Sequence, residues 1–232
     1  MKKIICILLI PLFSQGQINN TWLIGYGNWA TRARMVYDST NYVLTQENRK
    51  MGFEGTEATI SDANGNLLMS SNGVWIADAT GDTMMNGSGL NPGAEVNAYP
   101  KGLLLPYANI ILPYPNDTNK YVLFHHTCEW DGVSYPSYQV FYTVIDMTLN
   151  GGLGGVDSSQ KNVIALQDTL GWGLAACRHA NGRDWWIVVQ KQNTDSIFKI
   201  LFTTTGIASF SAQKLNVPKN WYDVTQPTFS PD

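Results

Sequence analysis

The segment KYVLFHHTCEWDGVSYPSYQVFYTVIDM, residues 120–147, contains two apolar runs joined by a loop around Asp131-Gly132. β-Branched and aromatic residues dominate both runs and no 3.6-residue apolar period is present, so each run is predicted as a strand. Residues 183–207, which begin RDWWIVVQK and end IFKILFTTTGI, repeat the same plan of strand, polar turn and strand. The chain is therefore predicted to be all-β.

Short apolar runs between turn signals predict the remaining strands. Together with those above, the predicted strands cover residues 21–24, 57–61, 67–71, 74–77, 103–112, 121–127, 138–146, 162–167, 174–179, 185–190, 197–204 and 207–215. Five Asn-Gly pairs, at 64–65, 72–73, 86–87, 150–151 and 181–182, favour hairpins with type I′ turns, whose two central residues have positive φ. Residues 84–100, rich in Gly, Asn and Pro, are predicted as a surface loop.

Repeated sheets of three or four strands favour a partial β-propeller with WD40-like blades, and a β-sandwich is the alternative. A four-stranded blade takes about 45 residues, so residues 17–232 would form about four blades. The segment QPTFSPD, residues 226–232, resembles the start of a further strand. We therefore expect this propeller region to be incomplete at its C-terminal end.

Residues 1–16 have the pattern of a cleaved signal peptide. Lys2 and Lys3 precede the apolar run 4–13, and small and polar residues follow it. The apolar run is too short to span a bilayer, so no membrane span is expected. Charged residues make up 14% of the chain and the net charge is -3, which argues against a nucleic-acid partner. The predicted localisation is secreted or at the cell surface.

Cys128 and Cys177 are the two cysteines that remain after signal cleavage. An exported protein can oxidise such a pair to a disulfide, but both residues end strand-like apolar runs. A disulfide and two buried free thiols therefore both remain open.

Several motifs, in this order, resemble the N-terminal β-propeller region of secreted Bacteroidota proteins. They are NTWLIGYGNWA, EGTEATISDANGNLLMSSNGVWI, YVLFHHTC, VFYTVIDMTLNGGLGGV, KNVIAL and RHANGRDWWIVVQK. Members of that group carry C-terminal domains for type IX secretion or associated with gliding motility. The resemblance, which extends over most of residues 21–232, implies export to the cell surface or the medium. The chain departs from the pattern because it contains no such sorting domain.

The candidate ligand-binding residues are His126, Trp130, His179 and Asp184. His179 could act as a base oriented by Asp184, but the intervening Asn181-Gly182 indicates a hairpin turn. Trp130 lies beside the predicted loop at Asp131 and could offer a stacking surface.

No metal or cofactor is predicted. His126 and Cys128 share a strand face, but paired ligands at the spacing of a zinc site are missing. The acidic residues suited to glycoside hydrolysis are Glu54, Glu57, Glu129, Asp146 and Asp184.

These observations favour a non-enzymatic binding or scaffold module that contacts a protein or glycan at the cell surface through its blade loops. The alternative is a carbohydrate-active hydrolase that uses Glu57 and Asp184 as its acid pair. An incomplete ring would also leave an open sheet edge, so edge-strand pairing or a dimer is expected if the chain is complete.

Overall fold

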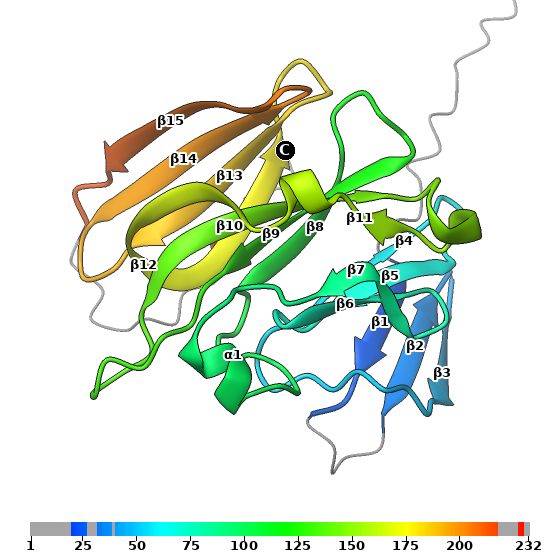
Figure 1. The fold of residues 1–232 in the computed structure, drawn as a ribbon. Helices are drawn as coiled ribbons and strands as arrows, with labels where there is room; N and C mark the ends of the chain where they lie inside the picture. Colours follow the sequence, from blue (N-terminus) through cyan, green and yellow to red (C-terminus); the bar gives the residue numbers. More distant parts are fainter. Residues whose placement is uncertain (1–19, 27–31, 39, 218–226, 230–232) are drawn as a thin grey trace, which may run out of the picture.

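The computed structural model describes residues 20–26, 32–38, 40–217 and 227–229. The predicted signal peptide lies outside these residues, as does most of the predicted further strand at 226–232. The described chain is all-β, as predicted (Figure 1). Its one α-helix, α1 (Ala94–Ala98), is short, and two 3-10 turns, Asn150–Gly152 and Ser158–Gln160, accompany it.

The strands follow one another mainly as antiparallel neighbours. Their bounds are β1 (Thr21–Ile24), β2 (Ala33–Tyr37), β3 (Tyr42–Gln46), β4 (Ala58–Ser61), β5 (Leu67–Ser71), β6 (Trp75–Asp78), β7 (Thr83–Ser88), β8 (Asn109–Pro113), β9 (Lys120–His126), β10 (Ser137–Asp146), β11 (Gly155–Val156), β12 (Val163–Arg178), β13 (Trp185–Lys191), β14 (Ser196–Thr203) and β15 (Gly206–Lys214).

Strand pairing gives two sheets, one of three strands (β1-β2-β3) and one of twelve strands (β4 to β15). We divide the larger sheet into three groups of strands, which together with the smaller sheet we call four layers. The first is β1-β2-β3 and the second is β4-β5-β6-β7. The third contains β8, β9, β10 and the start of β12, and the fourth contains the end of β12 with β13, β14 and β15. The long β12 therefore belongs to two layers, and its pairing shifts register between Leu170 and Leu174. The short β11 bridges β10 of the third layer to β7 of the second.

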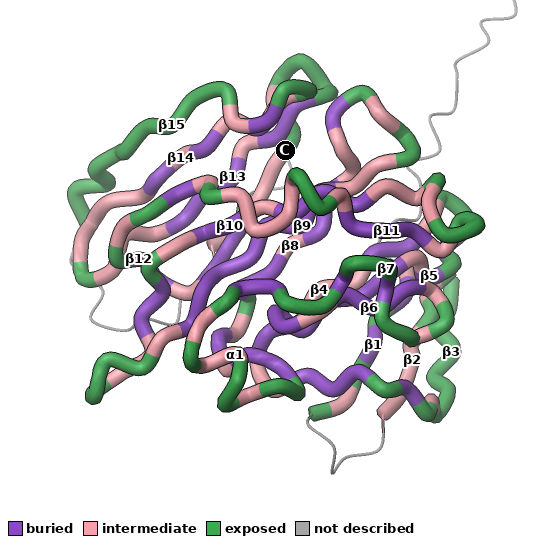
Figure 2. Tube along the Cα trace, in the orientation of Figure 1, coloured by how far each residue is buried: buried purple, intermediate pink, exposed green. Residues whose placement is uncertain are grey.

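The layers bury apolar side chains between them because strand residues alternate between faces. On β9, Val122 and Phe124 pack with Ile187 and Phe202 of the fourth layer, whereas Leu123 packs toward the second layer. A further cluster, which includes Leu23 and Leu67, joins the first layer to the second. Figure 2 shows the resulting buried stretches along the strands of the second, third and fourth layers.

The first strands of successive layers lie side by side. β1 lies beside β4, β4 beside β8, and β8 beside β12. Within the described chain, β1, β4 and β8 each form a strand ladder with one neighbour only. The cavities described below are lined by residues of these strands and of the segments beside them.

Several element predictions were wrong. β2, β3, β7 and β11 were not predicted, and the pattern divided β12 into two strands. β3, with the sequence YVLTQ, lacks the alternation of apolar and polar residues that marks a half-buried strand, and all of its residues are exposed. β7 occupies the start of the predicted loop 84–100, and its Asn86-Gly87 pair lies inside the strand rather than between strands.

The type I′ assignment of the Asn-Gly turns was also wrong at four of the five pairs. At pairs 64–65, 72–73 and 181–182 only the glycine has positive φ, at 86–87 only the asparagine does, and at 150–151 both do. Aspartate side chains organise many of the turns instead. For example, Asp62 Oδ1 accepts hydrogen bonds from the backbone N–H groups of Asn64 and Asn66, each at 2.8 Å.

Candidate functional site

A groove runs along the first strands of the four layers. A cavity of about 450 Å³ lies between β1 and residues 53–57. A second, of about 460 Å³, shares Glu57 with it and extends to β8, the second half of β12 and residues 227–229. A third, of about 350 Å³, shares Asn109, Ile110 and Ala176 with the second. We call these three cavities together the first-strand groove.

Glu57, directly before β4, is the residue common to the first two cavities. The two residues before it fix its position. Thr56 is fully buried; its backbone N–H donates to the Leu103 carbonyl at 2.9 Å and its hydroxyl donates to the Leu105 carbonyl at 2.6 Å. Gly55 lies against Leu104, where a Cβ atom would come within 2.1 Å of the carbonyl oxygen. The close packing of 55–56 on 103–105 therefore sets Glu57 at the groove wall.

The Glu57 carboxylate combines solvent access with an environment that is poor in polar partners. Its side chain is exposed through the groove, yet desolvation by the surrounding protein raises its pKa to about 7. Arg49 opposes this shift. This combination fits a carboxylate in a concave site, where water reaches the group while protein surrounds it on several sides. Among the described residues, no hydrogen bond or ion pair to Glu57 is present.

Arg49 is the cation that lowers the pKa of Glu57. Its guanidinium, however, already donates hydrogen bonds to backbone carbonyls. The buried guanidinium donates to the carbonyls of Met51, Ala33 and Ile24 at 3.1, 3.2 and 2.9 Å. Glu47 lies 3.8 Å from it. Arg49 therefore joins β1 and β2 to the segment that leads into the groove.

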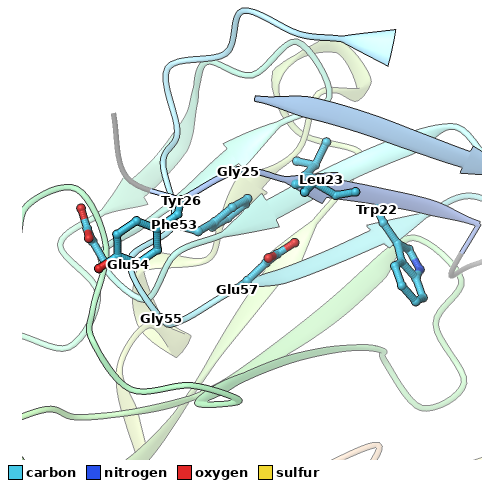
Figure 3. A pocket seen from close by; sticks show the side chains of 9 residues that line it. Trp22, Leu23, Gly25, Tyr26, Phe53, Glu54, Gly55 and Glu57 are labelled. Atoms are coloured by element: carbon cyan, nitrogen blue, oxygen red, sulfur yellow. The ribbon is translucent and has the colours of Figure 1, made fainter. Parts of the chain in front are cut away.

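Aromatic side chains line the first cavity together with two carboxylates. Tyr26 and Phe53 form a parallel β-bridge at the end of β1, and Trp22 lies further along the strand. Figure 3 shows Glu54 next to Tyr26 and Glu57 on the other side of the two rings, below Leu23. A hydrogen bond from Tyr26 to Glu54 raises the pKa of Tyr26. The two carboxylates do not point toward one another.

Asp184 is part of the β12–β13 turn, apart from this carboxylate pair. Its side chain accepts hydrogen bonds from Asn181 Nδ2 at 2.7 Å and from Arg183 Nε at 2.8 Å. The Arg183 contact lowers the pKa of Asp184. The Asn181 side-chain oxygen accepts from the N–H groups of Arg183 and Asp184. The carboxylate therefore stabilises a turn, and the structure does not bring it together with Glu57.

His179 belongs to the same turn. Its Nδ1 accepts a hydrogen bond of 3.2 Å from the Asn181 N–H, and its ring lies 5.7 Å from that of Trp186. Its backbone N–H donates to the Asp184 carbonyl at 2.8 Å. If His179 were a base oriented by Asp184, the two side chains would be hydrogen-bonded. No such hydrogen bond is present between these described residues.

His126 and its neighbour His125 are both fully buried. His126 Nδ1 lies 2.8 Å from Ser137 Oγ, and His125 lies between Asn91 and Thr143 at 2.7 and 2.9 Å. The two rings thus have separate partners, as period 2 predicts. Burial lowers the pKa of both to about 3, so both are neutral. His126 is not available to an external ligand unless the layers separate.

Cys128 and Cys177 are free thiols, so the disulfide alternative is not realised here. Burial raises the pKa of Cys128 to about 12. No group of three or more His, Cys, Asp or Glu side chains placed to hold a metal is found in the described ranges.

Trp130 lies in the loop between β9 and β10, with 51% of its surface exposed. Its ring centre lies 4.8 Å from that of Tyr135, with the two planes tilted by 46°, and the Tyr135 carbonyl accepts a hydrogen bond from Trp172. The expected exposure of Trp130 is therefore observed. It does not line the first-strand groove.

Sequence reasoning missed the contributions of Arg49, Thr56 and Phe53 to the groove. The segment GFEGTE, residues 52–57, offered only two glutamates close together as a signal.

Comparison with family models, with curated proteins and with solved structures gave no match for this chain. No helix in the described part of the chain is long and apolar enough to cross a membrane.

Proposed function

We propose that this protein is a non-enzymatic binding module that holds its ligand in the first-strand groove. The observation that carries the proposal is the run of three cavities with shared lining residues along the first strands of the four layers. Concave sites with apolar walls and a few polar groups are the usual form of a binding site. The groove thus replaces the blade loops as the preferred contact surface, and Trp130 becomes a separate, secondary candidate.

The proposal includes a β-propeller as the finer description of the fold. In a propeller, four-stranded antiparallel sheets are arranged around a central channel. Here, four successive groups of antiparallel strands with their first strands side by side support that description. The two-sheet topology also fits a β-sandwich, which is the alternative. The first layer has three described strands, and its edge strand β3 is exposed along its whole length.

The place of action that we propose is the cell surface or the medium. The signal-peptide pattern of residues 1–16 supports this location. The proposed resemblance to exported Bacteroidota propeller proteins rests on six sequence motifs between residues 20 and 191 and supports the same location. The expected partner is a protein or glycan encountered outside the cell.

The alternative, a carbohydrate-active hydrolase, has one supporting observation. Glu57, with a pKa raised to about 7, could donate a proton near neutral pH. Its proposed partner Asp184 is instead hydrogen-bonded to Arg183 and Asn181 in a turn. Glycoside hydrolysis needs two carboxyl groups across the scissile bond, and this arrangement does not supply that pair.

A matched pair of tyrosine variants tests binding in the groove. Tyr107 lines the second cavity and is 45% exposed, whereas Tyr138 on β10 is 41% exposed and lines none of the three cavities. We expect the wild-type chain and Tyr138→Ala to give the same signals on arrays of glycans and extracellular proteins. Tyr107→Ala should lose them. Equal signals from both variants, or no signal from the wild type, would contradict the proposal.

A separate assay tests the hydrolase. The wild type, Glu57→Gln and Asp184→Asn are incubated with a panel of polysaccharides, and released reducing ends are measured. We expect no release by any of them. Release by the wild type that both substitutions abolish would establish the alternative instead.

A further inference from the structure

We infer that the first cavity of the groove, between β1 and residues 53–57, binds an organic ammonium group such as a lysine side chain on a partner protein. This inference rests on the proposed function, because it names the chemical class of the ligand for the same groove. It follows from the lining residues, from their charges and from the absence of a partner for Glu57 among the described residues.

The lining of the cavity suits a cation with an alkyl stem. Tyr26 and Trp22, which are 60% and 52% exposed, provide most of the aromatic surface, and Ile24 adds apolar surface along β1. Phe53 and Leu23 also line the cavity, but both are almost fully buried. Aromatic faces attract ammonium groups through their quadrupole, and the attraction is strongest where water is partly excluded. The methylene groups of a lysine stem would cover the apolar wall.

The charge of the cavity also selects a cation. Two carboxylates, Glu54 and Glu57, line it, and no lysine or arginine of the described ranges does. Arg49 lies behind the wall, with its guanidinium donating to three backbone carbonyls and 5.1 Å from the centre of the Phe53 ring. Phosphate or another anion would therefore meet two carboxylates and no lining cation among the described residues, which argues against that class.

Glu57 is the group that would contact the ammonium. Glu54 is engaged by Tyr26, whereas Glu57 lacks a hydrogen bond or ion pair within the described residues. A neutral sugar could also donate hydrogen bonds to Glu57, but it would not require the carboxylate to be charged. An ammonium group does require it, and the two ligand classes therefore differ in their dependence on pH.

The pH dependence follows from the groups that face Glu57. Desolvation raises its pKa to about 7, with Arg49 opposing. The other titratable residues that share a cavity with Glu57 are Tyr26 and Glu54 in the first cavity and Tyr107 in the second. Below pH 7 the carboxyl group is mainly protonated, so an ammonium must displace a proton to bind. Affinity for the ammonium should therefore rise with pH until Glu57 is fully ionised.

The test is an NMR titration of the full chain with Nα-acetyl-lysine methylamide. Its neutral analogue, in which a hydroxyl group replaces the ammonium, and the disaccharide cellobiose are titrated in parallel. We expect the lysine probe to shift the amide signals of residues 23–26 and 53–57 at pH 8, and to bind about tenfold more weakly at pH 5.5. Glu57→Gln should weaken binding about tenfold at pH 8 and remove the pH dependence.

Glu129→Gln is the matched control, because desolvation also raises the pKa of Glu129 but this residue does not line the first cavity. It should bind the lysine probe like the wild type. Equal affinity for the lysine probe and its hydroxyl analogue, absence of lysine binding at pH 8, or unchanged binding by Glu57→Gln would overturn the ammonium assignment. The groove itself would still stand if Tyr107→Ala abolished the array signals. Retention of those signals by Tyr107→Ala would remove the groove proposal separately.

Discussion

Trp185 Nε1 donates a hydrogen bond of 2.8 Å to the carbonyl oxygen of Pro113, which joins β13 of the fourth layer to the end of β8 in the third. The indole is buried, and the Arg178 guanidinium lies 3.8 Å from the centre of its ring. The same ring belongs to the apolar cluster that holds these two layers together. One side chain thus contributes both a hydrogen bond and buried apolar surface to the contact between the layers at this end of the groove.

Trp185→Phe should lower the free energy of unfolding by about 1–3 kcal/mol, because it removes the donor to Pro113 and part of the buried ring. Trp185→Ala should cost about 3–5 kcal/mol through the cavity it leaves. Urea unfolding at neutral pH measures both. Trp130→Phe, at an exposed position, is the control and should change stability by less than about 0.5 kcal/mol. Equal losses at Trp130 and Trp185 would show that the interlayer contact is unimportant.

Acid should destabilise the fold through the two buried histidines. The unfolded chain binds protons at these residues near the ordinary pKa of 6.5, but the folded chain does so only near 3. Their contribution is therefore fully present above pH 6.5 and is lost as the pH falls toward 3. Each histidine should lower the free energy of unfolding by up to about 1.4 kcal/mol per pH unit within that window.

Glu57 acts in the opposite direction. Its folded pKa of about 7 exceeds the ordinary value of 4.5, so its contribution is present below pH 4.5 and is lost as the pH rises through 7. Glu57→Gln should therefore steepen the acid loss of stability between pH 6.5 and 5, and His126→Gln should flatten it. Urea unfolding at pH 7, 6 and 5 checks both slopes. If the free energy of unfolding had the same pH dependence in the wild type and in both variants, neither group would titrate as described.

The two thiols should differ in reactivity. Cys128 is 2% exposed and burial raises its pKa to about 12, whereas Cys177 is only half-buried, although desolvation raises its pKa too. Because the thiolate is the reactive form, iodoacetamide at pH 8 should label Cys177 first in the native protein. Cys128 should react only after unfolding in urea. Peptide mapping without reductant measures the labelling, and a Cys128–Cys177 cross-linked peptide would contradict the free-thiol state.

Local sequence was sufficient for the strands that lie half-buried between polar turns. β9, β10, β13 and β14 were all predicted to within one or two residues, because their alternating side chains face two different layers. β3 lacked the alternation of apolar and polar residues, because its sequence YVLTQ begins with three apolar residues in a row, and all five of its residues are exposed. The turn at 179–184 was also readable, because its hydrogen bonds connect residues close in sequence.

The groove could not be predicted in the same way. Glu57 was named as an acid, but its environment comes from contacts with residues 103–105 and from strands far apart in the chain. His126 was named as a ligand contact because histidine and cysteine share its strand. Its pairing opposite Val140, inside the third layer, buries it instead. Long-range packing therefore decides which of the named residues can meet a ligand.

Gly55→Ala tests the packing that places Glu57. The Cβ atom would lie 2.1 Å from the backbone carbonyl oxygen of Leu104, and a backbone neighbour cannot rotate away as a side chain can. The 55–56 segment must then shift, which would also strain the hydrogen bonds of Thr56 to Leu103 and Leu105. We expect a loss of about 2–4 kcal/mol in the free energy of unfolding, at the upper end of the range for overpacking.

Gly132→Ala provides the comparison. Nothing lies within 4 Å of a Cβ atom there, so only its positive φ of 96° opposes the substitution, at a cost of about 1–2 kcal/mol. Gly55→Ala should in addition change the amide signals of residues 53–57 and weaken binding in the first cavity, whereas Gly132→Ala should do neither. If Gly55→Ala were as stable as the wild type with unchanged groove signals, the close approach to Leu104 could not be what positions Glu57.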